Sequence, residues 1–444
     1  MCHPRTVWMV LFVLATPAWC PGANSDEVFG DPLKLDALVA YARQHNPEVR
    51  AAEARWRAAQ ARPSQEGSLP DPMANTAYHN ESFDRFRQGS SEFTFLRFGV
   101  EQEVPFPGKL TLRESVAARE ADREGALYRA TVLNVTARLR IAYSDYFLAH
   151  RSIEIVGNNR DLLQKLTEAA EARYQVGEGL QQDVVRAQVE LSILVGRLIG
   201  LEQERQSAAA MVNAVLNRPP ATSLGVPAPV EKRPLSHTLD QLERLVTENS
   251  PDLKAAEFGV ARAETNLSLA KRQYYPDFVV RADYFNKASL VPEWEVGAGI
   301  RVPLYFWRKQ TLGVHEAAAG VREARASRQN TSQEVLARLR DLYAQATSAD
   351  RLVELYGNAV VPQAEVSLHS ASAGYQVGKV DFLTLLNNFT VLNEYQLRYY
   401  EELAKFDRAV ARIEEVAGLP PDEDSESSGN ERSPSAPSAE VPHE

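Results

Sequence analysis

Cysteine is almost absent from this chain of 444 residues, which contains only Cys2 and Cys20. Both lie within or beside an N-terminal segment with an apolar run at residues 7–18. That run is too short to span a bilayer and is typical of a secretory signal peptide, which we predict for residues 1–23. An exported chain that has lost this segment would contain no disulfide and would perform no thiol chemistry.

Cys20 is a candidate site of lipid attachment. Trp19 and Pro17 precede it at positions where a lipoprotein signal favours small and aliphatic residues, so ordinary cleavage near residues 18–23 is the alternative.

Long apolar runs are missing from the rest of the chain. No later segment approaches the roughly 20 apolar residues that a membrane-spanning helix needs. If the mature chain crosses a membrane, it must therefore do so as a β-barrel.

Motifs of known catalytic chemistry are absent as well. The sequence has no Walker loop, dinucleotide fingerprint, nucleophile elbow or zinc-protease helix. Six histidines are scattered along the expected folded part without a pair at ligand spacing: His45, His79, His150, His237, His315 and His369. The net charge of −10 and the lack of a basic patch argue against nucleic acid as a partner. We expect no enzyme, no cofactor and no resident metal site.

An internal repeat with a period of about two hundred residues is what the chain does contain. Ala137 to Arg140 return unchanged as Ala337 to Arg340, and Tyr174 to Gly177 return as Tyr375 to Gly378. A period this long indicates a duplicated unit of domain size. We predict a first repeat over residues 24–220, a linker over 221–236, a second repeat over 237–421 and a disordered tail, rich in Ser, Pro and acidic residues, over 422–444.

Long helices dominate both halves. Residues 109–174 contain no proline and residues 309–374 contain only Pro362, and each segment would extend roughly 100 Å as a helix. Shorter helical segments flank them at 35–62, 180–216, 239–272 and 380–417. Since two short segments together match one long helix, we predict two short helices stacked end to end beside each long one. Gly177 and Gly378 are expected to end the long helices where the chain reverses.

One pair of strands is predicted in each half, between the first short helix and the long helix. Residues 278–285 and 294–302 alternate between apolar and polar, and residues 73–81 and 92–104 do so less regularly. Strands of about 9 to 11 residues suit a transmembrane barrel. Four strands cannot close a useful barrel, so we expect several copies of the chain to complete one.

This order of elements, built twice after a signal peptide, resembles the TolC-like outer-membrane efflux proteins. The resemblance covers about residues 35–419. Its motifs are Asn46-Pro47, the segment Leu69 to Pro72, the junction Val104 to Lys109, the turn Tyr375 to Gly378 and the closing segment Glu414 to Gly418. The Pro-Phe-Pro-Gly-Lys junction is most similar to the branch of the family that serves heavy-metal efflux with RND-type pumps.

The resemblance implies a mainly helical chain in which a small set of β-strands lies in the membrane. It implies a homotrimer in which four strands per chain form a twelve-strand barrel in the outer membrane, above an α-barrel tunnel across the periplasm. A periplasmic adaptor protein and an inner-membrane RND-type pump would be its partners. Two alternatives stay open: a drug or type I secretion channel, and a non-conducting periplasmic coiled-coil adaptor or scaffold.

The resemblance also places the periplasmic aperture of such a tunnel at the Tyr-x-x-Gly turns. The candidate residues are Tyr174, Gly177, Glu178, Asp183, Tyr375, Gly378, Lys379, Asp381, Thr384 and Asn387. Family members can have acidic residues six and nine positions after the second glycine, where this chain has Thr384 and Asn387, so a tight ring of carboxylates is not expected.

Other contacts could hold the aperture closed. Lys379 and Asp381 could form charge-assisted links with Glu178 and Asp183, and the hydroxyl of Tyr375 could bond across the seam. The alternative is that these charges are solvated and the tyrosine packs on a neighbouring helix.

The helix that follows this turn has an apolar stripe, Phe382, Leu385, Leu386, Phe389 and Leu392, with Asn387, Asn388 and Asn393 outside it. We expect the stripe to pack on neighbouring helices and the amides to face the water of the tunnel.

Overall fold

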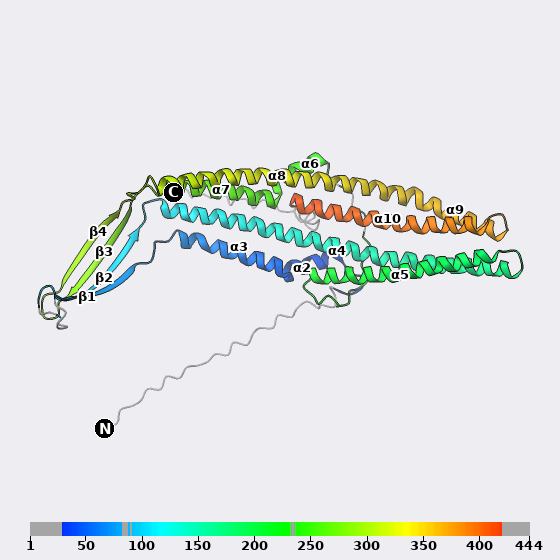
Figure 1. Ribbon diagram of the computed structural model, residues 1–444, viewed down its shortest axis with the longest axis horizontal. Helices are drawn as coiled ribbons and strands as arrows, with labels where there is room; N and C mark the ends of the chain where they lie inside the picture. The colour runs from blue at the N-terminus through cyan, green and yellow to red at the C-terminus, as the bar shows by residue number, and fades with distance from the viewer. Residues whose placement is uncertain are drawn as a thin grey trace, which may run out of the picture.

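The computed structural model describes residues 29–81, 88, 91–230, 232, 235 and 237–419. The predicted signal peptide, Cys20 and the predicted tail lie outside these residues. The described part is an elongated bundle of helices with a small sheet at one end (Figure 1). None of its helices combines the length and the apolar character needed to cross a membrane.

The elements follow the same order in both repeats, as predicted. The first repeat contains α2 (Leu35–His45), α3 (Pro47–Glu66), β1 (Met73–His79), β2 (Phe95–Val104), α4 (Lys109–Gln175) and α5 (Gln181–Val215). The second contains α6 (Leu239–Asn249), α7 (Pro251–Arg272), β3 (Asp277–Asn286), β4 (Glu293–Arg301), α8 (Gln310–Leu355), the π-helix η1 (Tyr356–Val360), α9 (Val361–Gln376) and α10 (Phe382–Ala417).

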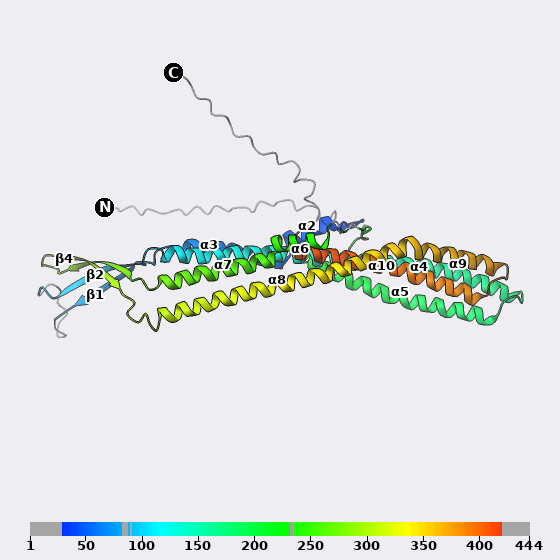
Figure 2. The ribbon, with the colours of Figure 1, turned by 90° about the horizontal axis from the view of Figure 1, so that it is seen from above.

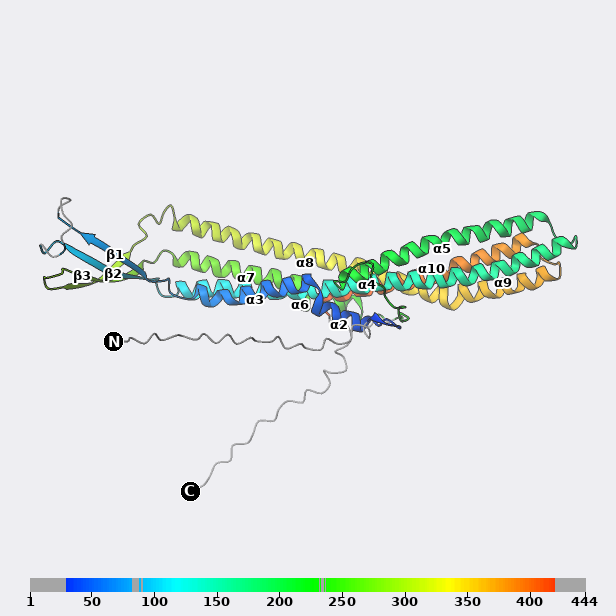
Figure 3. The ribbon, with the colours of Figure 1, turned by 90° about the horizontal axis from the view of Figure 1, so that it is seen from below.

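Shorter helices lie end to end along each long helix, which confirms the predicted packing. Helix α3 follows the half of α4 nearest the sheet, and α5 follows the other half. Helices α7 and α10 accompany the second long helix in the same way (Figures 1 and 3). The two repeats meet along α4, which packs against both α7 and α10.

Prolines divide the first short segment of each repeat, which we had predicted as one helix. The segment at 35–62 breaks at Asn46, and that at 239–272 breaks at Ser250. Proline lacks an N–H for the helical ladder but suits the first position of a new helix. Asn46 completes the break, because its side-chain oxygen accepts from the N–H of Glu48 at 2.8 Å and its amide donates to the carbonyl of Val215 at 2.8 Å.

The linker is packed onto the first repeat where the structure describes it. Leu33 donates its N–H to the carbonyl of Val226 at 2.8 Å and pairs with Pro227 in a short parallel bridge. The hydroxyl of Tyr143 in α4 donates to the carbonyl of Leu33 at 2.7 Å and lies 3.1 Å from that of Ala228. This part of the linker is therefore held on α4.

The four strands form one antiparallel sheet in the order β1-β2-β3-β4. Its register places Phe98, Tyr284 and Trp294 side by side on one face, and these aromatic rings are exposed. Arg281 and Glu295 form an ion pair of 2.9 Å on the other face. The predicted alternation of an apolar and a polar face is confirmed.

A buried charge cluster joins the two repeats near the middle of the bundle. Arg140 of α4 is 2 % exposed and forms ion pairs with Glu414 and Asp407 of α10. Asp407 also accepts from the hydroxyl of Ser144. Arg340, the repeat counterpart of Arg140, is instead exposed and pairs with Glu243 at 2.7 Å. The arginine at this repeat position is therefore buried in the first repeat and exposed in the second.

Candidate functional site at the tips of the helical hairpins

The two Tyr-Gln-Val-Gly motifs form the turns at the end of the bundle opposite the sheet, as predicted (Figure 1). Gly177 and Gly378 have φ angles of 80° and 73°, in the left-handed region. The residue after each glycine donates its N–H back to the helix end, Glu178 to Arg173 at 2.9 Å and Lys379 to Gly374 at 2.8 Å. This is the bonding of a Schellman turn, in which glycine avoids the steric cost of a Cβ atom.

The two tyrosines of the motif have different environments. Tyr174 is 46 % exposed, whereas Tyr375 is 5 % exposed. The ring of Tyr375 packs edge-on against Phe382 with 5.5 Å between the centroids. Burial raises the pKa of the Tyr375 hydroxyl, and the charge of Arg173 opposes this shift. In the described part of one chain the hydroxyl has no hydrogen bond and the ring packs on α10, while a bond of the hydroxyl across the seam to another chain stays a prediction.

Arg173 connects the two tips. Its guanidinium lies 4.9 Å from the centre of the Tyr375 ring and donates a hydrogen bond to the backbone carbonyl of Tyr375. The sequence prediction missed this residue. The sequence does distinguish this position, because the two repeats differ there: Arg173 precedes the first Tyr-Gln-Val-Gly motif, whereas Gly374 precedes the second.

The four charges expected to link the tips form no ion pair with one another among the described residues of a single chain. Glu178, Lys379 and Asp381 are exposed, and Asp183 is half-buried. Charge-assisted links through these residues therefore stay a prediction for contacts between chains.

Thr384 and Asn387, at the positions where acids had been considered, are exposed polar residues on the first turns of α10. The hydroxyl of Thr384 donates to the carboxylate of Asp381 at 2.5 Å, and this bond holds the pKa of Asp381 below its usual value. The expected polar, largely uncharged lining is therefore present on this helix, while its place in an aperture stays a prediction.

The apolar stripe of α10 is buried as expected, and Phe382, Leu385 and Phe389 are at most 2 % exposed. Asn393 departs from the prediction that it faces the tunnel. It is buried, and its side-chain oxygen accepts a hydrogen bond of 2.9 Å from Asn159 of α4. Both amides are paired across the repeats, so this polar pair is compatible with the core.

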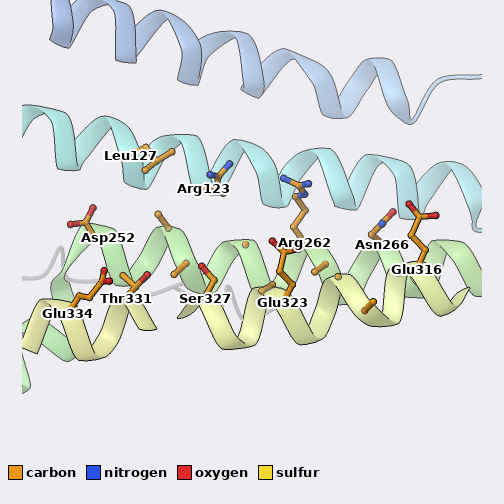
Figure 4. A pocket seen from close by; sticks show the side chains of 18 of the residues that line it. Arg123, Leu127, Asp252, Arg262, Asn266, Glu316, Glu323, Ser327, Thr331 and Glu334 are labelled. Carbon is orange, nitrogen blue, oxygen red and sulfur yellow. The ribbon is translucent and has the colours of Figure 1, made fainter. Parts of the chain in front are cut away.

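A groove of 1110 Å³ lies in the half of the bundle nearest the sheet, between α4, α7 and α8 (Figure 4). Its lining includes Arg123, Arg262, Glu316 and Glu323, and Arg262 of α7 forms an ion pair of 2.7 Å with Glu120 of α4. The charges are of both signs. In the described part of the chain no group of three or more histidines, cysteines or acids is arranged to hold a metal ion.

The chain is similar to known export proteins along most of its length. A family model described as "Outer membrane efflux protein" matches residues 38–218 and 242–419, once in each repeat. The cobalt-zinc-cadmium resistance protein CzcC of Cupriavidus metallidurans is 22% identical over 398 residues, which are 87% of this chain and 90% of that protein. The pyoverdine export outer membrane protein OpmQ of Pseudomonas putida is 23% identical, over 88% of this chain and 87% of its own.

Solved structures share the fold. The outer membrane protein VceC of Vibrio cholerae has a TM-score of 0.74 at 20% identity, with 87% of this chain and 96% of that chain covered. The channel CusC has a TM-score of 0.74 at 14% identity, with 88% and 94% covered. The fold is thus TolC-like, and because the family model accounts for both repeats, this chain belongs to the outer membrane efflux protein family.

Proposed function

We propose that this protein is the outer-membrane exit duct of a tripartite efflux pump and that its cargo is heavy-metal cations. The observation that carries the proposal is the match of the efflux family to both repeats of a chain whose paired long helices end in closed turns at one end and a sheet at the other. An RND-type pump and a periplasmic adaptor would supply the energy and the connection, and the chain itself would supply a passage without catalysis.

A ring of three chains is supported by helix faces that one chain leaves uncovered. Within the chain, α4 packs on α10 across the two repeats. The repeat counterparts of these elements are α8–α9 and α5, which carry exposed apolar residues: Val185, Val189, Val195 and Ile199 on α5, and Leu355 and Val366 on α8–α9. Packing α5 of one chain on α8–α9 of the next would repeat the internal contact from chain to chain and close a ring.

The sheet is suited to the same arrangement. Its strands alternate in direction, and β1 and β4 are its open edges. An even number of strands lets β4 of one chain pair with β1 of the next in antiparallel fashion, so three chains would close twelve strands. The apolar face with Phe98, Tyr284 and Trp294 would meet lipid, and the face with Arg281 and Glu295 would line the passage.

The metal cargo rests on the similarity to CzcC, together with the Pro-Phe-Pro-Gly-Lys junction at residues 105–109. Met73 and His79 add soft and imidazole ligands on β1, where the register places both on the polar face of the sheet. His79 stacks on Phe95 at 5.1 Å, which keeps its ring at the surface of the strand.

An organic cargo is the second candidate, because OpmQ is named for pyoverdine export and another relative, FusA of Burkholderia cepacia, for fusaric acid resistance. A drug or type I secretion channel would use the same duct. The adaptor alternative receives no support from the family, whose model describes outer membrane efflux proteins.

Growth of a strain lacking the gene, compared with its complemented parent, separates the two cargo classes. The panel would contain copper, silver, zinc, cobalt and cadmium salts beside dyes, detergents and a siderophore. We expect selective sensitivity to metal salts, and the affected ions would name the cargo. Sensitivity to organic compounds alone would contradict the metal assignment and leave the duct, whereas purified protein without conductance in planar bilayers would contradict the duct.

A further inference from the structure

One turn of the second long helix differs from its counterpart in the first. Helix α4 is continuous from Lys109 to Gln175, but the second long helix changes to a π-helix at Tyr356–Val360 before α9 begins. There the N–H of Val361 donates to the carbonyl of Tyr356, five residues earlier. Figure 2 shows the helix changing direction between α8 and α9. Single π turns inside α-helices are uncommon and recur at functional sites.

An extra residue accounts for the wide turn. Gly157 and Gly357 lie 200 residues apart in the repeat, whereas Tyr174 and Tyr375 lie 201 apart, so the second long helix contains one more residue between these positions. A π turn accommodates such a residue within a continuous helix. Pro362, whose repeat counterpart is Asp161, follows the turn and lacks the N–H that a regular helix would use there. The interruption is thus a local property of the second repeat.

The π turn lies directly against α10. A Cβ atom on Gly357 would come within 2.9 Å of Cε2 of Tyr399, whereas one on the counterpart Gly157 would meet nothing within 4 Å. The ring of Tyr356 lies 5.7 Å from that of Tyr395 on the same helix. The backbone of η1 therefore packs against aromatic rings of α10. Such contacts are less directional than hydrogen bonds, so they allow η1 to shift relative to α10.

The strong ties between the repeats lie on the sheet side of this level. Arg140 binds Glu414 and Asp407, and Arg408 binds Asp145. From Tyr399 to the tip, the described polar contacts between α4 and the α9–α10 hairpin are the neutral bonds of Asn159 to Asn393 and Gln396 and the contact of Arg173 with Tyr375. The distal hairpin is therefore held on α4 mainly by packing of buried apolar side chains, which is not directional, and by few charged contacts.

We propose that η1 is the hinge about which α9 pivots when the tip opens. The inference rests on the proposed function and places the pivot at a single turn of the second long helix. Helix α9 has 16 residues and is about 24 Å long, so a bend of about 10° at η1 displaces its tip by roughly 4 Å. That displacement separates Tyr375 from Arg173 beyond the roughly 6 Å reach of a cation–π contact.

Paired spin labels measure the hinge without reference to transport. In the full-length protein in lipid nanodiscs, Glu354→Cys with Glu365→Cys places labels on either side of η1. Glu154→Cys with Lys165→Cys is the matched pair on α4, and all four positions are exposed. The only native cysteines, Cys2 and Cys20, lie in the N-terminal segment, and the sequence after residue 20 contains none. We expect a broader distance distribution for the pair across η1, and narrowing to the width of the α4 pair when Ala359 is deleted and Pro362→Asp is added, which together restore the spacing and the N–H of the first repeat. Equal widths for the two pairs would overturn the hinge.

Single-channel recording then connects the hinge to opening. Deletion of Ala359 with Pro362→Asp restores the spacing of the first repeat and the missing N–H, so we expect openings to become about tenfold rarer, the effect of about 1.4 kcal/mol, which is near the net value of one backbone hydrogen bond. Gly157→Ala is the control variant and should open like the wild type. Unchanged opening of the variant that lacks Ala359 and carries Pro362→Asp would overturn the role of η1 in gating. A wild type that never conducts would overturn the proposed duct alone, because the label distances would still report the hinge.

Discussion

The guanidinium of Arg173, on the first hairpin, lies 4.9 Å from the centre of the Tyr375 ring on the second. The same side chain donates to the backbone carbonyl of Tyr375. Its contact is directional at the backbone and electrostatic at the ring, so it holds the two tips in one relative position. The internal repeat offers no second copy of it, because Gly374 occupies the matching place.

Replacement of Arg173 by Gln removes the charge and the contact with the ring while keeping a side chain of similar length. We expect the isolated channel to open about tenfold more often, since the loss combines a cation–π contact and a charged hydrogen bond that together are worth about 1.4 kcal/mol or more. Single-channel recording in planar bilayers measures this. Arg160→Gln on the same helix is the control, because among the residues that the structure describes Arg160 pairs only with its neighbour Asp161.

Tyr375 allows the hydroxyl and the ring to be tested separately. Tyr375→Phe keeps the packing on Phe382 and the backbone acceptor, so its conductance should match the wild type. Tyr375→Ala removes the ring and should raise the frequency of opening. A large effect of Tyr375→Phe would instead restore a gating role for the hydroxyl through a contact between chains.

Replacement of glycine by alanine should change the free energy of unfolding in opposite directions at Gly378, in the left-handed turn, and at Gly259, in a helix. Gly378→Ala forces a Cβ atom into a φ of 73° and should lower the free energy of unfolding by about 1 kcal/mol. Gly259 lies within α7, where a Cβ atom would meet nothing within 4 Å, so Gly259→Ala should raise it by about 0.5 to 1 kcal/mol. Urea titration followed by circular dichroism measures both. Equal losses in the two variants would contradict the turn as the cause.

The repeat made most of the fold predictable from sequence. Matching glycines located both turns, and alternating residues located all four strands to within a few positions. The helix breaks were less accessible, because Pro47 and Pro251 start new helices whereas Pro362 lies within a long one, and the packing around each decides between these outcomes. Arg173 was missed for a related reason: its role depends on how closely two hairpins approach, which no local pattern encodes.

Arg140 and Arg340 are identical in the repeat but differ in burial, so they form a matched pair for mutation. Arg140→Ala removes a buried guanidinium that pairs with Glu414 and Asp407 and should cost about 3 to 5 kcal/mol of stability. Arg340→Ala removes an exposed pair with Glu243 and should cost less than about 1 kcal/mol. The difference would appear as a lower thermal midpoint for Arg140→Ala alone. Similar midpoints for both variants would show that the cluster is open to solvent in the assembled protein.

Tyr143 gives the fold a dependence on alkaline pH. Burial raises the pKa of its hydroxyl to about 12, from an ordinary value of 10.0. The folded state therefore keeps a proton that the unfolded chain loses, so the stabilising effect is complete below pH 10 and declines as the pH rises from 10 to about 12. The difference between the two pKa values corresponds to about 2 to 3 kcal/mol of the free energy of unfolding. Tyr143→Phe lacks this proton but also loses the hydroxyl's bond to Leu33, so it should be less stable than the wild type at pH 9 and approach it at pH 12. Urea unfolding of both proteins at pH 9, 10, 11 and 12 measures the difference. A gap that stays constant over this range would show that the hydroxyl titrates alike in the folded and unfolded chains.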